Sequence, residues 1–300
     1  MTNESGGGAF DKHRNLLFSV AYRVLGVAAD AEDVVQDTWL KWSAADGSQV
    51  ADPKSYLVRI TTNLAMDRLR AAQTRRETYV GPWLPEPILT STDTADEVST
   101  ADTVSMGLLV VLETLTPLER AVFVLKEAFG FTYAEIAKAV DRSEETVRQA
   151  AHRARGHVRA RRPRFPTDRT RQRAVTERFL AAAAGGDINT LMQLLAPDVT
   201  LWTDGGGKVR QAIRPITGAQ RVATWFAAVA VQPYQGIEPV NMAIELVELN
   251  GQVGLVFSDG GRIIATVTFD LDDDGVITGI HDVANPDKLR AVTARTIHHL

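Results

Sequence analysis

The chain of 300 residues contains no cysteine, which excludes disulfide bonds, thiolate metal sites and cysteine nucleophiles. No apolar stretch approaches the roughly 18–20 residues that a membrane-spanning helix requires, and no signal-peptide pattern precedes Phe10. The net charge of −4 and the 45% share of hydrophobic residues are typical of a globular protein. We therefore expect a cytoplasmic protein of two or three domains, with no metal and no cofactor.

Positive charge is concentrated in the middle of the chain. Residues 105–173 contain 14 basic and 8 acidic side chains, whereas residues 1–104 and 174–300 each carry more acids than bases. Between Arg148 and Arg173 there are ten arginines and a single acid. Such a run is usually a solvated surface, but it also suits the neutralisation of nucleic-acid phosphates.

Residues 132–155 have the pattern of a helix-turn-helix. Thr132 and Glu135 form the two ends of a capping box, which predicts that a helix starts at Thr132. Residues 141–142 make a turn, and Ser143 is a second N-cap ahead of a helix with an acidic first turn. In DNA-binding proteins the second helix of this motif enters the major groove. Two capped amphipathic helices also occur in proteins that never contact DNA.

The second helix of this motif has two distinct faces. Val147, Ala151 and Ala154 are predicted to face inward. Arginine and glutamine recognise guanine and adenine edges, and glutamate accepts a hydrogen bond from cytosine. The side chains predicted on the outward face are Glu144, Arg148, Gln149, His152 and Arg155. DNA is therefore the leading partner.

The N-terminal half is predicted to consist of helices and a linker. Helical periodicity extends through residues 10–76, with a helix capped by Asp30 and another that begins at Pro53. Residues 79–104 are rich in Pro, Ser, Thr and Asp and contain no Lys or Arg, which is typical of a linker. Helices resume near Ser105.

Beyond residue 170 the pattern changes from helices to strands. Short helices come first, and Asn-Gly, Asp-Gly-Gly and Asp-Asp-Gly turns then separate the strands. The predicted strands are Val199–Trp202, Ala243–Glu248, Val253–Phe257, Ile263–Phe269 and Val276–Asp282. Helices followed by a curved antiparallel sheet predict an α+β domain.

Several blocks of sequence resemble the extracytoplasmic-function sigma factors, group IV of the sigma-70 family of RNA polymerase sigma factors. Residues 30–42 (DAEDVVQDTWLKW) and 56–70 (YLVRITTNLAMDRLR) are similar to region 2 of that family. Residues 115–120 (LTPLER), followed by the helix-turn-helix, are similar to region 4. The resemblance covers roughly residues 10–162, in the family's order and spacing.

The remaining sequence resembles the subgroup of this family that carries a C-terminal SnoaL-like extension. The matching segments are residues 83–87 (WLPEP), 204–208 (DGGGK) and 285–289 (NPDKL). The resemblance implies a multidomain protein with two all-α sigma domains and a cone-shaped α+β domain with a curved antiparallel sheet. The implied parts are region 2 over residues 1–78, a Pro-rich and acidic linker over 79–104, region 4 over 105–165 and the SnoaL-like domain over 170–300.

By this resemblance, region 2 holds core RNA polymerase and captures the melted strand of the −10 element. Asn63 stands where the family places a polar residue that holds an unstacked base, and Arg59, Arg68 and Arg70 are expected to follow the phosphates. Asp67 matches the same motif, with an intrahelical or capping partner as an equal alternative. The expected polymerase contacts, which without the family context are equally well explained as a solvated helix face, are Asp33, Gln36, Asp37, Leu40 and Lys41.

Region 4 is expected to bind the −35 element through Arg148, Gln149 and Arg153. Many family members have Ser-Arg after the first basic residue, where this chain has Gln149 and Ala150. Because Ala150 cannot hydrogen bond to a base, we expect a different base preference. The linker acids are expected either to imitate the transcript electrostatically in the polymerase channel or to act as a solubilising spacer. These acids are Asp93, Asp96, Glu97 and Asp102.

A SnoaL-like fold contains a pocket that different relatives use for catalysis, binding or dimerisation, so the fold does not decide its function. Trp202, Asp204, His281 and Asp282 are candidates to line it, and a His–Asp pair could do acid–base chemistry, although a structural role is favoured. Residues 204–208 lack the flanking sequence of a phosphate-binding P-loop and are expected to meet another protein surface. An unknown small-molecule ligand is a further candidate partner.

The extension is expected to regulate the sigma domains in cis. By resemblance it takes the place of a separate anti-sigma protein and packs against region 2 and the linker, with Trp83 as an aromatic anchor. Deleting residues 170–300 is expected to change transcription without abolishing polymerase binding. The residues from Asn285 onwards are a separate candidate, for a small contact that activity requires. The expected regulatory contacts are Trp83, Leu84, Pro85, Asp204, Lys208, Asn285 and Asp287.

The sequence therefore predicts an alternative sigma factor, not an enzyme, which binds core RNA polymerase and promoter DNA but no membrane. The first alternative is a one-component helix-turn-helix regulator with a small-molecule-sensing C-terminal domain, which has no need for residues 30–70. The second is a SnoaL-like isomerase or hydrolase with a DNA-binding appendage. That enzyme would require turnover that is lost on replacing His281 or Asp204.

Overall fold

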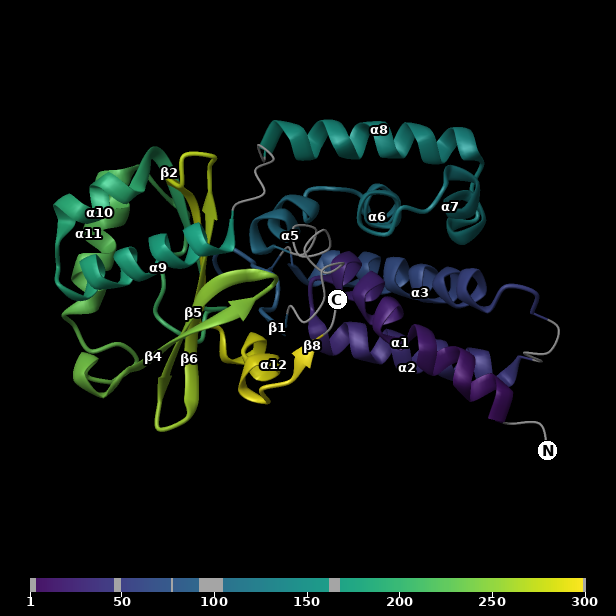
Figure 1. Cartoon of the computed structure of the whole chain (residues 1–300), viewed down its shortest axis with the longest axis horizontal. Coiled ribbons are helices and arrows are strands. Elements are labelled where there is room, and N and C mark those ends of the chain that lie inside the picture. Colours follow the sequence, from purple (N-terminus) through teal and green to yellow (C-terminus); the bar gives the residue numbers. More distant parts are fainter. Residues whose placement is uncertain (1–3, 46–49, 77, 92–104, 162–167, 299–300) are drawn as a thin grey trace.

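The computed structural model describes the chain except for residues 1–3, 46–49, 77, 92–104, 162–167 and 299–300. The acidic linker residues therefore lie outside the described part of the chain. Two helical units stand beside an α+β domain, and the described part of the linker and the C-terminal strand lie between them (Figure 1). Among the described residues, no helix is both long and apolar enough to cross a membrane.

The first helical unit consists of α1 (Glu4–Leu25), α2 (Ala28–Ala44) and α3 (Pro53–Arg76). The prediction that Asp30 caps α2 is wrong, because the helix already begins at Ala28. The Ala28 N–H donates a hydrogen bond of 2.7 Å to the Glu86 carboxylate, which lies in the linker. A negative charge at this position is also favoured by the helix dipole. A distant residue thus caps α2.

The second helical unit consists of α5 (Met106–Leu112), α6 (Pro117–Phe123), the π-helical turn η2 (Val124–Ala128), α7 (Tyr133–Val140) and α8 (Glu144–Arg161). The predicted capping box at Thr132 and Glu135 is confirmed, and α7 ends at Asp141 in a left-handed conformation with φ of 53°. Ser143 Oγ accepts a hydrogen bond from the Thr146 N–H at the start of α8. The helix-turn-helix prediction is therefore confirmed.

The two helical units are packed against each other. Their buried side chains form one hydrophobic cluster, to which Leu17 and Leu69 contribute from the first unit and Leu109, Phe123 and Ile136 from the second. Helix α3 lies beside α6 and α7. Because the core is shared, separating the units would expose apolar surface.

The C-terminal domain contains α9 (Arg169–Ala184), α10 (Ile188–Leu194), α11 (Ala219–Ala230) and the short α12 (Arg290–Thr293), with the 3₁₀ turns η3 (Pro239–Asn241) and η4 (Pro286–Lys288). Helices α9, α10 and α11 cover one face of the sheet, and α5 and α12 lie on the other side (Figure 1). The helices-then-strands prediction of an α+β domain is confirmed, although α11 was not predicted.

The described strands form an eight-stranded sheet in the order β3-β2-β7-β6-β5-β4-β1-β8. They are β1 (Leu89–Thr90), β2 (Leu195–Asp204), β3 (Ile216–Thr217), β4 (Ala243–Leu249), β5 (Gln252–Asp259), β6 (Arg262–Leu271), β7 (Ile277–Val283) and β8 (Ile297–His298). All five predicted strands are present. The sheet is mixed rather than wholly antiparallel, because β2 pairs with β7, and β1 with β8, in parallel. Strand β1 belongs to the linker, so the linker is part of this sheet.

Candidate nucleic-acid interface and interdomain cluster

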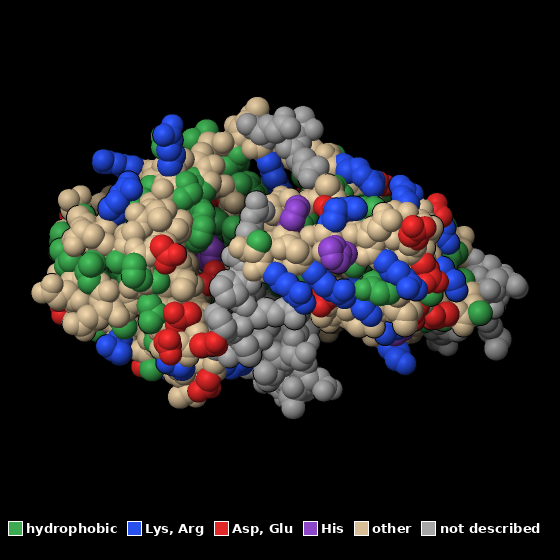
Figure 2. All heavy atoms as spheres, turned by 90° about the horizontal axis from the view of Figure 1, so that it is seen from above, with side chains coloured by type: hydrophobic (Ala, Val, Ile, Leu, Met, Phe, Trp, Pro, Cys, Tyr) green, Lys and Arg blue, Asp and Glu red, His purple; other side chains and the backbone are tan. Residues whose placement is uncertain are grey.

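Helix α8 presents a polar face that the other helices leave uncovered. Val147 and Ala154 are fully buried and Ala151 is 2% exposed, as predicted. Figure 2 shows basic side chains along the opposite face, with acidic ones at the end away from the C-terminal domain. Glu144, Gln149 and His152 are exposed, and Arg148 makes an exposed ion pair of 3.0 Å with Glu144.

The next two arginines of α8 are engaged within the second helical unit. Arg153 Nε donates to Glu119 at 2.6 Å, and Arg155 Nε donates to Glu127 at 2.7 Å. Burial of the Glu119 carboxyl raises its pKa, but the hydrogen bonds from Arg153 and Thr116 outweigh this and lower it. Both guanidinium groups are thus oriented by acids before any phosphate is bound.

Ala150 does not support the predicted change in base preference, which stays a prediction. Ala150 is fully buried in the cluster that the two helical units share. It faces away from the exposed side of α8, so its lack of a hydrogen-bonding group has no direct effect on the bases that this helix contacts. Ala150 therefore belongs to the same buried face of α8 as Val147, Ala151 and Ala154.

The side chain of Asn63 on α3 is held by the second helical unit. Asn63 Nδ2 donates to the Arg59 carbonyl and to the Ala139 carbonyl of α7, at 2.9 Å in both cases. Arg59 is exposed, and Asp67 pairs with Arg70 at 2.5 Å, which corresponds to the intrahelical alternative. Helix α7 therefore occupies a donor of the side chain that was predicted to capture a base.

Arg68 joins α3 to the predicted polymerase-binding face of α2. Its guanidinium group lies 3.1 Å from Asp33, 3.3 Å from Asp37 and 3.0 Å from the Asp30 carbonyl. Two of the predicted polymerase contacts are therefore engaged with a predicted DNA contact. The rest of the face includes an exposed apolar side chain, Leu40, at 58%. Its other predicted members, Gln36 and Lys41, are exposed.

Trp83 lies at the meeting point of the helical units and the C-terminal domain. The Arg76 guanidinium carbon is 3.6 Å from the centre of its ring, and Lys288 Nζ is 3.9 Å from that centre. Cations over the face of an indole ring are attracted to its negative quadrupole. We call the set Arg76, Tyr79, Trp83, Asp204 and Lys288 the Trp83 cluster.

The buried carboxylate of Asp204 organises this cluster. It accepts hydrogen bonds from Tyr79 Oη at 2.5 Å, the Leu84 N–H at 2.8 Å, Lys288 Nζ at 2.6 Å and the Gly206 N–H at 3.1 Å. Burial lowers the pKa of Lys288 to about 8, and Asp204 opposes that shift. The two charges neutralise each other in a site from which water is excluded.

The Trp83 cluster continues into the second helical unit. Arg76 also pairs with Glu113, and Glu113 pairs with the buried Arg120 of α6. Arg120 Nε in turn donates to the Arg23 carbonyl of α1 at 3.0 Å. A chain of charged groups thus connects all three parts of the protein.

Other predicted regulatory residues surround the Trp83 cluster. Asn285 Nδ2 donates to Tyr79 Oη at 2.8 Å, and Leu84 and Pro85 are buried. Lys208 and Asp287 form a half-exposed ion pair of 2.5 Å with each other. Neither Tyr79 nor Lys288 was predicted, although Lys288 lies within the 285–289 segment that carries the family resemblance.

His281 pairs with Asp270, which was not predicted, and not with Asp204 or Asp282. His281 and Asp282 are consecutive on β7 and point to opposite faces of the sheet. His281 stacks on Trp202 with ring centres 5.0 Å apart and lies 2.9 Å from Asp270. Of the four residues predicted to line the pocket of the C-terminal domain, only Asp282 does so.

These features define a protein with two packed helical units, the second containing a helix-turn-helix, beside an α+β domain. Residues 9–75 match the family Sigma-70 region 2, and residues 105–158 match Sigma-70, region 4. The chain is 38% identical over 289 residues to the ECF RNA polymerase sigma factor SigJ of Mycobacterium tuberculosis, covering 93% of this chain and 91% of SigJ. It is 35% identical to the probable ECF RNA polymerase sigma factor SigI of the same species, over 71% of this chain and 73% of SigI.

The fold agrees with these sequence matches. The crystal structure of M. tuberculosis SigJ superposes with a TM-score of 0.75 at 36% identity, covering 94% of this chain and 97% of that one. The chain belongs to the extracytoplasmic-function sigma factors of RNA polymerase. The predicted resemblance is confirmed, and the match to region 2 rules out the one-component regulator.

Proposed function

We infer that the chain acts as an alternative sigma factor, whose partners are RNA polymerase and promoter DNA. We propose that its C-terminal SnoaL-like domain regulates this activity in cis, by keeping regions 2 and 4 packed against each other until core RNA polymerase binds. The observation that carries the proposal is the hydrogen bond from Asn63 of region 2 to the Ala139 carbonyl of region 4. We infer that the chain acts in the cytoplasm and catalyses no reaction of its own.

Asn63 cannot present the same donor to a base while it is bound to Ala139. Capture of an unstacked base requires the edge of the amide to be accessible, so α7 must move away from α3 first. Such movement would also free Arg59 and Asn63 as a continuous surface for the melted −10 strand. The closed arrangement would thus oppose promoter opening, although the outward face of α8 is uncovered.

We assign the −35 contacts to the outward face of α8. Phosphate neutralisation by its arginines would position region 4, and the polar side chains between them would discriminate bases. The proposed contacts are Glu144, Arg148, Gln149, His152, Arg153 and Arg155. We assign the −10 contacts to Arg59, Asn63, Asp67 and Arg68, and the contacts with core polymerase to Asp33, Gln36, Asp37, Leu40 and Lys41.

The Trp83 cluster is the proposed connection between the C-terminal domain and this closed arrangement. Lys288, which Asp204 holds, and Arg76 at the end of α3 both lie over the Trp83 ring. Arg76 reaches α6 of region 4 through Glu113. Loosening this cluster would therefore favour separation of regions 2 and 4. A small-molecule ligand of the C-terminal domain would act on the same contact.

Run-off transcription with purified core RNA polymerase and a promoter library tests the proposal. Promoter-specific transcripts should appear only when the protein is added. Trp83→Ala should raise their yield, because a loss of one to two kcal/mol in the closed arrangement shifts its population by a factor of about 5 to 30. Glu177→Ala, which removes an exposed ion pair of 3.0 Å with Arg173 on α9, should transcribe like the unmodified protein.

Two results would refute cis regulation by this route. The first is that Trp83→Ala transcribes at the unmodified level while still binding core polymerase. The second is that Glu177→Ala changes transcription as much as Trp83→Ala does. Binding to core polymerase is measured separately by co-purification, so that a lost polymerase contact is not mistaken for a change in regulation.

A further inference from the structure

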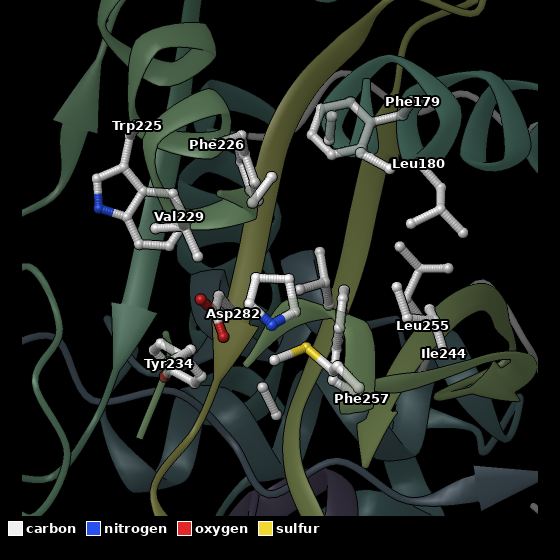
Figure 3. A pocket seen from close by; sticks show the side chains of 17 residues that line it. Phe179, Leu180, Trp225, Phe226, Val229, Tyr234, Ile244, Leu255, Phe257 and Asp282 are labelled. Carbon is white, nitrogen blue, oxygen red and sulfur yellow. The ribbon is translucent and has the colours of Figure 1, made fainter. Parts of the chain in front are cut away.

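The C-terminal domain contains a cavity of about 330 Å³ between α9, α11 and the sheet. Figure 3 shows Trp225, Phe226, Phe179 and Phe257 around it, with Asp282 and Tyr234 together on one side. Its volume lies at the lower end of the ~300–1,000 Å³ range of small-molecule sites, and its walls are mostly apolar. The cavity is large enough for a compact organic molecule.

Asp282 is the acidic residue that lines this cavity, and one of its oxygens has no partner among the described residues. The side chain is 4% exposed, and Oδ2 accepts a hydrogen bond of 3.1 Å from Gln211 Nε2. The same Gln211 nitrogen donates to Tyr234 Oη at 2.8 Å. Among the described residues, Oδ1 accepts from none and donates to none. A buried polar atom without a partner is costly, so it is expected to have a function.

The charge state of Asp282 suits a neutral ligand. Burial raises the pKa of this carboxyl to about 7, and the nearby Asp204 carboxylate acts in the same direction. The carboxyl group can therefore donate a proton in a hydrogen bond as well as accept one near neutral pH. An anion would be repelled once the carboxyl ionised. A cation is disfavoured by Lys208 and Arg210, which line the hollow adjoining the cavity at Trp225 and Tyr234.

We propose that this cavity binds a neutral, largely apolar small molecule with one hydroxyl or carbonyl oxygen, which hydrogen bonds to Asp282 Oδ1. The aromatic and aliphatic walls would supply most of the affinity through burial of apolar surface. The carboxyl group would supply selectivity for an oxygen at one position. The binding site itself does not depend on the function proposed for the domain.

The cavity is connected to the Trp83 cluster by the loop over residues 205–211. At one end of this loop, Gln211 holds Asp282 and Tyr234. At the other end, Gly207 packs so closely on the linker that a Cβ atom there would lie 3.2 Å from Val80 Cβ. A ligand that displaces Gln211 would therefore move a loop in contact with the linker. This consequence, unlike the binding itself, rests on the proposed regulation in cis.

Binding is tested by calorimetric titration of the full chain, without polymerase, using three probes of matched shape. They are 2-naphthol, naphthalene and the anion 2-naphthoate. We expect saturable binding of 2-naphthol and of naphthalene, with 2-naphthoate at least tenfold weaker than 2-naphthol. Preferred binding of 2-naphthoate, or no saturable binding of either neutral probe, would overturn the proposal.

Two substitutions locate the bound probe. Asp282→Leu should lower the preference for 2-naphthol over naphthalene by about 2- to 10-fold, the range of a single hydrogen bond. Ala265→Phe, which fills the cavity from β6, should weaken both neutral probes at least tenfold. If Ala265→Phe does not fold, Val229→Trp fills the cavity from α11 instead. Unchanged binding in a folded cavity-filling variant, or an unchanged preference in Asp282→Leu, would refute the site.

The connection to regulation is tested by run-off transcription with saturating 2-naphthol. A change in transcript yield that Ala265→Phe abolishes would support the connection through the 205–211 loop. Saturable binding with no change in yield would refute the connection and leave the site in place. A change in yield that persists in Ala265→Phe would show that the probe acts elsewhere.

Discussion

At the scale of single residues, two lysine–aspartate pairs in the C-terminal domain differ in their surroundings. The Lys288–Asp204 pair is buried between the linker and the sheet, whereas Lys208 and Asp287 are 52% and 51% exposed. Exposed pairs contribute little because water competes with them and screens their charges. In a buried pair, loss of one partner leaves the other charge without compensation. The pairs therefore provide a matched comparison.

We predict that Lys288→Met lowers the free energy of unfolding by about 3–5 kcal/mol, because it strands the Asp204 carboxylate. Lys208→Met should change it by no more than about 1 kcal/mol. Urea unfolding followed by circular dichroism measures both variants against the unmodified chain. Similar small losses in the two variants would show that Tyr79 and the backbone N–H groups alone compensate the Asp204 charge.

A second prediction at this scale concerns pH and Asp282. The carboxyl group has an ordinary pKa of 3.8 and a folded-state pKa of about 7, so the folded chain binds more protons between these values. Its contribution to stability is therefore lost as pH rises from about 4 to 7, by at most about 1.4 kcal/mol per pH unit, and is constant outside that window. Asp282→Leu should remove this slope. The difference in unfolding free energy between the variant and the unmodified chain, measured at pH 5 and pH 8, isolates the effect. An equal difference at both pH values would contradict the shift.

At the scale of elements, the sequence predicted the helix caps and hairpin turns that residues close together in the chain determine. Capping at Thr132 and Ser143, and the hairpin turn at Asn250 with φ of 51°, follow from residues a few positions apart. Strands β1 and β8 could not be predicted, because each has two residues and its partners lie far away in the sequence. The parallel pairing of β2 with β7 is equally non-local. The sequence therefore predicted most of the long strands, but not which segments far apart in the chain pair with each other.

For the candidate site residues, too, exposure on a helix could be predicted, but contacts between distant segments could not. The exposure of Arg148 and Gln149 followed from helical periodicity. The bond from Asn63 to Ala139 could not be predicted, because it depends on how two helical units pack. The role of Lys288 was missed for a related reason, since its partners Trp83 and Asp204 lie in two other segments.

The cap that Glu86 forms on α2 leads to a prediction for this helix. Burial raises the pKa of the Glu86 carboxyl, while the Ala28 N–H opposes that shift. Glu86→Ala would leave buried N–H groups unpaired and should cost about 1–3 kcal/mol of unfolding free energy. Residues 79–91 should also become more sensitive to limited proteolysis. Glu32→Ala is the matched control, because Glu32 lies in α2 itself and makes an exposed ion pair of 2.9 Å with Arg14. An equal effect of the two substitutions would contradict the capping role.

At the scale of the whole molecule, the linker makes deletion of the C-terminal domain difficult to interpret. Leu84 and Ile88 are fully buried, and strand β1 pairs with β4 and β8. Removing residues 170–300 would expose these apolar side chains and an unpaired strand edge, which favours association with other chains. A changed activity of residues 1–170 would then combine lost regulation with a damaged linker. Single substitutions in the Trp83 cluster avoid this problem.

Opening of the closed arrangement can be measured directly, because the chain has no native cysteine to interfere with labelling. We predict that spin labels on Ala44→Cys in α2 and His157→Cys in α8, both exposed positions, give one dominant distance in the free protein. Core RNA polymerase should add a longer distance as α7 leaves α3 and Asn63 becomes accessible. Trp83→Ala should populate the longer distance without polymerase, because it removes the ring between Arg76 and Lys288. If polymerase leaves the distribution unchanged, the packing of Asn63 on Ala139 is not what opposes promoter opening. If Trp83→Ala raises transcription without lengthening the distance, the cluster acts on polymerase or DNA instead of on the contact between regions 2 and 4.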